Sequence, residues 1–156
     1  MRPAFAALIA AAMFMVGPAR AQDTPKPAAP LPAANAPEGP GLGEIMMLQQ
    51  LRHIKLWFAG HAGNWPLADY EIGELVQGFD DVNKLIGGDT AEKHVGGPIK
   101  ALEKAVADKN RTAFEAAFDK LSAGCNSCHR TLERGFIAIQ RPTLQPYSNQ
   151  SFAPQK

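Results

Sequence analysis

Apolar side chains recur at every third or fourth position between residues 42 and 136, and no stretch alternates apolar with polar residues as a β-strand would. The breaks in this period predict four helices: one over about 42–62, one over about 67–87, a short one that begins at Pro98, and a last one that opens at Thr112. Because the connections are short, consecutive helices should be antiparallel neighbours. The predicted fold is an all-α, antiparallel four-helix bundle.

Turn and capping residues set the predicted helix ends. Pro66 suits the first turn of the second helix, and two consecutive glycines end that helix. The stretch GGDTAEKHVGG, residues 87–97, is expected to be a polar loop. Thr112 and Glu115 form a capping-box pattern at the start of the last helix.

The first predicted helix has two neighbouring faces with large side chains. One face carries Met47, Leu51, Ile54 and Phe58. The other carries Met46, His53 and Trp57 at the same spacing. We expect the first face to be apolar core and the second to supply a further surface toward the interior.

The chain's two cysteines continue the apolar spacing of the last helix. This stripe, with steps of three or four residues, comprises Phe114, Phe118, Leu121, Cys125, Cys128, Leu132 and Phe136. Both thiols are therefore expected on the buried side of the helix, in line with the core aromatics.

Cys125, Cys128 and His129 form the C-x-x-C-H pattern of covalently bound c-type haem. In that chemistry the thiols form thioethers with two porphyrin vinyl groups, and the adjacent histidine binds iron on the proximal side. A thioredoxin-type dithiol would instead begin a helix after a strand, and structural zinc would need four ligands. A disulfide would close a very short loop and leave the histidine unexplained. The pattern favours one covalent haem c.

With CNSCH late in the last of four helices, the chain resembles the class II c-type cytochromes, the cytochrome c-prime and cytochrome c556 group, over about 43–139. The resemblance implies a haem inside the bundle, Cys125 and Cys128 as thioether residues, and His129 as the proximal iron ligand. It also implies a first-helix residue on the distal side and allows a homodimer. Leu132, Glu133 and a long C-terminal segment depart from the family pattern, so the chain looks like a divergent member.

The resemblance places the distal residue near the middle of the first helix, within about a turn of Gln50, which makes His53 the possible distal iron ligand, with Met46 as runner-up. The alternatives are a histidine bonded to water or a carboxylate, and a methionine that fills the core. His61 suits the negative C-terminal end of its helix, and His94 is expected to be solvated in a loop. Four basic residues are candidate partners of the haem propionates, or simply solvated helix surface: Arg52, Lys55, Arg130 and Arg134.

The ends of the chain predict export. Residues 1–21 have the charge, apolar core and small-x-small cleavage pattern of a signal peptide, and 22–41 form a Pro/Ala-rich linker expected to be disordered. The four-helix cytochrome domain is expected over 42–140, followed by an extended tail at 141–156. Without the signal peptide 14 basic residues face 15 acidic ones, and no basic stripe for nucleic acid is present. No apolar run after the signal peptide approaches membrane-spanning length.

These features together predict a periplasmic mono-haem cytochrome that carries electrons between redox partner proteins and is not an enzyme. The alternative is a five-coordinate haem protein that binds NO or CO behind an apolar distal wall drawn from Met47, Leu51, Ile54 and Phe58. A third class is a haem-free dithiol or metal-binding module.

Overall fold

Residues 39–156 are described by the structure, a computed structural model. They contain four helices, α1 (Leu42–His61), α2 (Trp65–Ile86), α3 (Thr90–Ala107) and α4 (Arg111–Thr131), and within this range there is no strand. The all-helical prediction is thus confirmed. The signal peptide expected at 1–21 and most of the linker expected at 22–41 lie outside the described residues.

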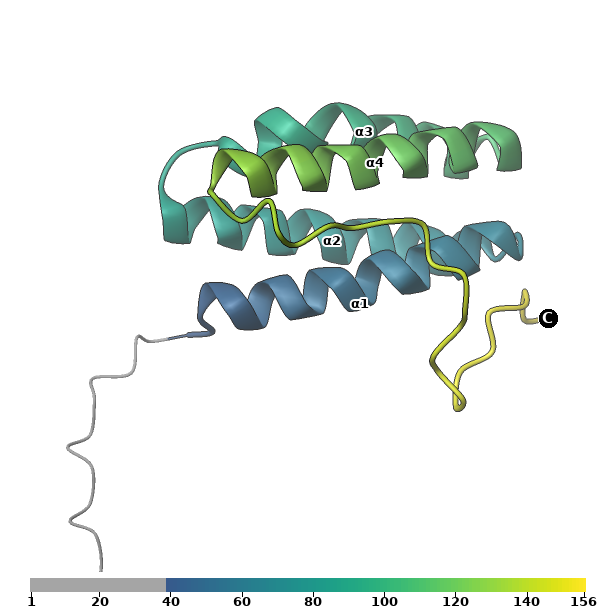
Figure 1. The fold of residues 1–156 in the computed structure, drawn as a ribbon. Helices are drawn as coiled ribbons and strands as arrows, with labels where there is room; N and C mark the ends of the chain where they lie inside the picture. The colour runs from purple at the N-terminus through teal and green to yellow at the C-terminus, as the bar shows by residue number, and fades with distance from the viewer. Residues whose placement is uncertain (1–38) are drawn as a thin grey trace, which may run out of the picture. The chain divides into compact units, whose positions relative to one another are not determined.

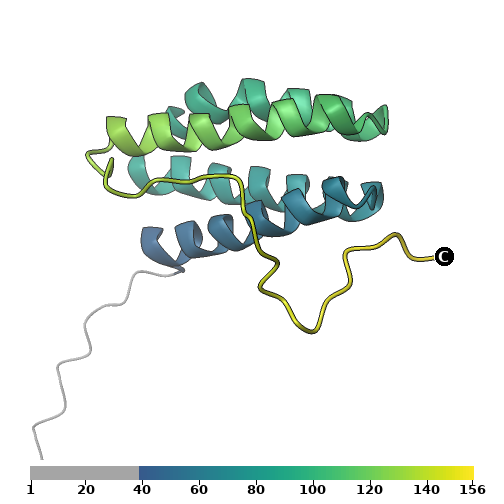
Figure 2. The same ribbon diagram turned by 45° about the vertical axis from the view of Figure 1, so that its right-hand side comes forward.

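Helices that follow one another in the chain pack side by side, so that α1 lies against α2, α2 against α3, and α3 against α4 (Figure 1). Helices α1 and α4 contact each other much less than these pairs do. In both views the segment after α4 runs along the opening between α4 and α1 (Figures 1 and 2). We call this opening the α1–α4 seam. The bundle is therefore closed on this side partly by irregular chain.

The core is formed by apolar side chains from all four helices. The largest fully buried ones are Leu56, Ile72, Leu75, Leu102, Phe114, Phe118 and Leu121. Full burial of such a side chain contributes roughly 1.5–3 kcal/mol to folding. The inward positions predicted for Phe114, Phe118 and Leu121 from the stripe of the last helix are correct.

The predicted start of the third helix is wrong, because α3 begins at Thr90 and includes most of the expected polar loop. The Asn83 side chain accepts a hydrogen bond from the Ala91 N–H group (2.8 Å), which satisfies a donor in the first turn. Pro98 lies inside the helix, where its missing N–H leaves the His94 carbonyl without its usual partner. Gly124 of α4 approaches this carbonyl so closely that a Cβ there would lie 2.5 Å from the oxygen.

Both predicted ends of the last helix are also wrong. The N-cap of α4 is Asn110, whose side chain accepts a hydrogen bond from the Ala113 N–H group (3.0 Å), rather than Thr112. The helix stops at Thr131, and Glu133 has a positive φ of 58°, which turns the chain back toward the bundle. Phe136, expected on the buried stripe, is therefore 80% exposed.

The inward face of α1 differs from the predicted apolar face. Met47 and Leu51 are exposed, whereas His53 and Trp57 from the second face are buried. The buried stripe also includes Gln49, whose amide donates a hydrogen bond to the Leu75 carbonyl (2.8 Å). Because Gln49 and His53 are polar, the apolar pattern placed the buried face of α1 about one position away from where it lies.

Candidate cofactor site

A cavity of about 550 Å³ lies inside the bundle and is lined by residues of all four helices and of the segment after α4. Its apolar wall includes Met46, Leu75, Phe79, Val82, Val95 and Leu121. Cys125, Cys128, His129 and His53 line the same cavity. This volume is in the range that holds a cofactor-sized ligand. The structure therefore brings together the residues of the C-x-x-C-H pattern and the expected distal candidates.

The two thiols stand in the last two turns of α4, where no helix N-terminus favours a negative charge. Both cysteines are free. Burial, together with the neighbouring Cys128, raises the pKa of Cys125 to about 12, and burial also raises the pKa of Cys128. Reactive dithiols have a lowered pKa, so these groups differ from a thioredoxin-type redox pair. Neutral sulfur in an apolar wall suits a thioether linkage.

His129 is buried, and its Nδ1 lies 2.8 Å from the carbonyl oxygen of Ile137. A carbonyl can only accept, so Nδ1 carries the proton and Nε2 keeps its lone pair. Within residues 39–156 the Nε2 atom has no hydrogen-bond partner. This tautomer, fixed by a backbone carbonyl, is the usual state of a metal-binding histidine.

His53 is held by a residue of α4. Its Nε2 lies 2.9 Å from the hydroxyl of Ser122, which in turn donates to the Phe118 carbonyl (3.1 Å). The hydroxyl proton is thus used, so the oxygen accepts the proton of Nε2. Burial lowers the pKa of His53 to about 4, and its ring packs on Phe118 with 4.3 Å between centroids. Ligation of iron through Nε2 would require the bond to Ser122 to break.

The expected distal wall is only partly present in the cavity. Met46 is half-buried and Met47 is mostly exposed, yet both line it. Phe58 packs instead against Phe152 (5.8 Å between ring centroids). Ile54 lines a smaller cavity of about 220 Å³ beside the segment after α4. Of the four residues named for this wall, Met47 alone contributes to the larger cavity.

The candidate propionate partners are distributed unevenly. Arg134 lines the cavity. Arg52 forms an ion pair with Glu74 (2.8 Å), and the Lys55 ammonium lies 5.2 Å from the ring centroid of Tyr147. Arg130 is exposed. Arg134 is therefore the best placed of the four to pair with an anionic group at the cavity mouth.

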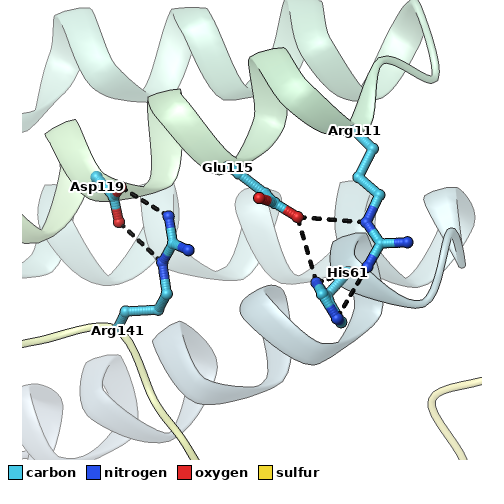
Figure 3. A network of polar contacts seen from close by, with 5 residues as sticks. All are labelled: His61, Arg111, Glu115, Asp119 and Arg141. Carbon is cyan, nitrogen blue, oxygen red and sulfur yellow. Dashed lines mark hydrogen bonds and ion pairs between the residues drawn. The ribbon is translucent and has the colours of Figure 1, made fainter.

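The remaining histidines take other roles. His61 lies on the surface in a cluster with Arg111 and Glu115, with its Nδ1 3.3 Å from the Glu115 carboxylate (Figure 3). His94, expected in a solvated loop, is half-buried on α3 and lies 3.3 Å from the Thr131 hydroxyl. Neither histidine lines the larger cavity.

Sequence reasoning missed three residues that support the site. Ser122 holds His53, Ile137 accepts the His129 proton, and Asn126 bonds the backbone of Ile139 twice. Ser122 lies beside the apolar stripe, four residues after Phe118 and next to Leu121, and a polar residue this close to a buried stripe is a signal that could have revealed it. The bonds of Asn126 depend on a chain reversal that no periodicity predicts.

No protein-family model, curated protein or solved structure matches this chain. Among the helices of residues 39–156, none combines the length and apolar character needed to cross a membrane. In the same part of the chain, no three His, Cys, Asp or Glu side chains are grouped so that they could hold a metal ion by themselves. The interpretation of the site rests on its residues and geometry.

Proposed function

We propose that this chain is a periplasmic mono-haem c-type cytochrome that carries electrons. Cys125 and Cys128 would form the two thioethers and His129 would be the proximal iron ligand. The observation that carries the proposal is that these three side chains, from one end of α4, line a single apolar cavity of about 550 Å³. The free Nε2 of His129, with Nδ1 fixed by a carbonyl, supports it further.

When bound, the haem would supply a one-electron iron centre, held by Cys125, Cys128 and His129. The helical backbone of α4 fixes the spacing of the two thiols and the histidine. The apolar wall would stabilise a flat hydrophobic ring. Arg134 is placed to pair with a propionate. A haem held by His129 and by a second residue such as His53 would exchange electrons with little rearrangement.

A second function is favoured by one observation, the hydrogen bond between His53 and Ser122. While this bond persists, Nε2 of His53 would not be free to bind iron, and the cavity would offer apolar residues such as Met46 to a small ligand. A small neutral ligand such as NO or CO would then bind there. In this form the protein would be a gas-binding haem protein rather than an electron carrier.

The absorption spectrum of the exported protein tests both functions. The pyridine haemochrome assay should give one covalent haem per chain, and no haem would defeat the proposal. Low-spin bands that CO does not move would support electron transfer with a closed sixth position. High-spin bands that shift with CO would support gas binding instead.

Two substitutions then assign the distal residue. If His53 binds iron, His53→Ala should convert low-spin iron to high-spin, whereas Ser122→Ala should leave the low-spin bands in place. If the bond to Ser122 keeps His53 away from iron, Ser122→Ala should release the imidazole and increase the low-spin fraction. A spectrum unchanged by His53→Ala would remove His53 as a ligand.

A further inference from the structure

We infer that residues 137–141, which we call the strap, are a built part of the cofactor site, and that Asn126 and Arg141 are positioning residues that hold the strap against His129. The inference rests on the proposed function. It concerns the residues around the proximal ligand rather than the ligand itself.

The first anchor is a two-bond clasp between Asn126 and Ile139. The Asn126 amide donates to the Ile139 carbonyl (2.7 Å), and the Ile139 N–H group donates to the Asn126 side-chain oxygen (2.7 Å). Two bonds to one residue fix both the position and the direction of the strap. Because Asn126 lies between the two cysteines, the clasp ties the strap directly to the C-x-x-C-H turn.

The second anchor is Arg141, which bridges the α1–α4 seam. Its guanidinium makes two bonds to the carboxylate of Asp119 on α4, of 3.1 and 2.7 Å (Figure 3). The same group lies 4.3 Å from the ring centroid of Trp57 on α1. A single exposed ion pair contributes little, but bidentate geometry and an aromatic face together make a defined anchor.

Between α4 and these anchors, the strap presents the Ile137 carbonyl to Nδ1 of His129 (2.8 Å). Ile137 and Ile139 also line the larger cavity. A hydrogen bond from Nδ1 to a carbonyl makes the opposite nitrogen a stronger electron donor. A firmly held strap should therefore stabilise ferric iron relative to ferrous iron and lower the reduction potential.

The test compares two substitutions inside the motif in the haem-loaded protein. Asn126→Ala should raise the reduction potential and speed the exchange of the His129 Nδ1 proton with solvent. It should also speed exchange of the Ile139 amide, on the order of fivefold or more. Ser127→Ala is the matched control, because within residues 39–156 the Ser127 hydroxyl makes no hydrogen bond. Asn126→Asp keeps the oxygen that accepts from the Ile139 N–H group. Exchange of the Ile139 amide in this variant should therefore be slower than in Asn126→Ala.

Arg141→Gln provides a second test that separates the strap from simple charge. Loss of a positive charge alone lowers a reduction potential, as Arg130→Gln at an exposed position should show. Loss of the strap acts in the opposite direction, so the potential of Arg141→Gln should lie above that of Arg130→Gln. Equal downward shifts in the two arginine variants would overturn the role of Arg141.

The outcomes distinguish this inference from the proposed function. A wild-type chain without haem would defeat the proposed function. Haem that is bound with an unchanged potential and unchanged proton exchange in Asn126→Ala would defeat the strap alone. Loss of haem from Asn126→Ala but not from Ser127→Ala would support the strap, because only Asn126→Ala removes the clasp.

Discussion

Several buried polar side chains in this bundle are placed by partners on another helix, such as His53 by Ser122. Gln49 bonds the Leu75 carbonyl and accepts a hydrogen bond from Arg52 (3.0 Å), while Arg52 pairs with Glu74. Glu71 differs from these residues because it is a carboxylic acid and is only 3% exposed. Burial raises its pKa above the ordinary value of 4.5 and repulsion from Glu74 adds to this, although the nearby cations Lys55 and Arg52 oppose the shift.

Glu71→Gln should make stability less sensitive to pH. A carboxyl group whose pKa is raised in the folded state stabilises the fold below its unfolded pKa, and this contribution is lost as the pH rises through the folded pKa. The advantage of Glu71→Gln over wild type should therefore grow as the pH rises from 4.5 toward 7. Urea unfolding at several pH values measures it, with the exposed Glu103→Gln as control. A difference that is constant with pH would contradict the prediction.

Gly124 controls how closely α3 and α4 approach beside Cys125. A Cβ at this position would meet the His94 carbonyl oxygen at 2.5 Å, and backbone cannot move aside as a flexible side chain can. Gly124→Ala should cost about 1–3 kcal/mol of unfolding free energy. Gly73→Ala, on an open face of α2, should gain about 0.5–1 kcal/mol. Equal effects of the two substitutions in urea unfolding would show that this close approach is unimportant.

At the same scale, the sequence predicts some site residues and not others for a physical reason. Cys125, Cys128 and His129 are adjacent in the chain, so their joint chemistry is visible in the sequence. His53 and Ser122 are 69 residues apart, and their pairing depends on how α1 and α4 pack. The contacts of Asn126 and His129 with residues 137–139 depend on the reversal at Glu133, whose positive φ is not favoured by its residue type.

Among the elements, α4 carries the motif, and its first turn sets where the helix begins. Asn110→Ala should destabilise the protein by about 1 kcal/mol, because it removes the side-chain acceptor of the Ala113 N–H group. Thr112→Ala should change stability little, since Thr112 is an exposed residue inside the helix. Thermal unfolding of both variants decides between the observed cap and the predicted capping box. A larger loss for Thr112→Ala would favour the box.

The helices themselves were predictable because each buries one stripe, whereas their ends were not. The start of α3 was missed because residues 87–97 contain four glycines and several polar residues, which favour a loop locally. Tertiary contacts override this preference, since Ala91 and Val95 are buried and Asn83 caps the first turn. The predicted C-terminal end of α4 was too far along the chain for the converse reason. Its apolar spacing continues to Phe136 although the chain has already turned away.

In the folded unit as a whole, the segment after α4 packs against the helices as a fifth element. The strap covers the α1–α4 seam, and farther along Phe152 is buried against Phe58 while Asn64 donates to the Ala153 carbonyl (3.2 Å). Phe152 thus holds the tail to the domain. What composition could not show is that the segment before this tail lines the cavity through Arg134, Ile137 and Ile139.

The size of the cavity leads to a prediction about the whole protein. The cavity of about 550 Å³ is partly open to solvent, since exposed residues such as Met47 also line it, so its apolar wall contacts water unless something fills it. The same chain produced in cells without a cytochrome c maturation system should therefore bind more hydrophobic dye. It should also unfold about 10 °C or more below the haem-loaded protein. The Cys125→Ala/Cys128→Ala variant should behave like the haem-free chain in cells that have that system, and Ser127→Ala should behave like wild type. Identical melting curves and dye binding for all four preparations would mean that the cavity is not where the cofactor resides.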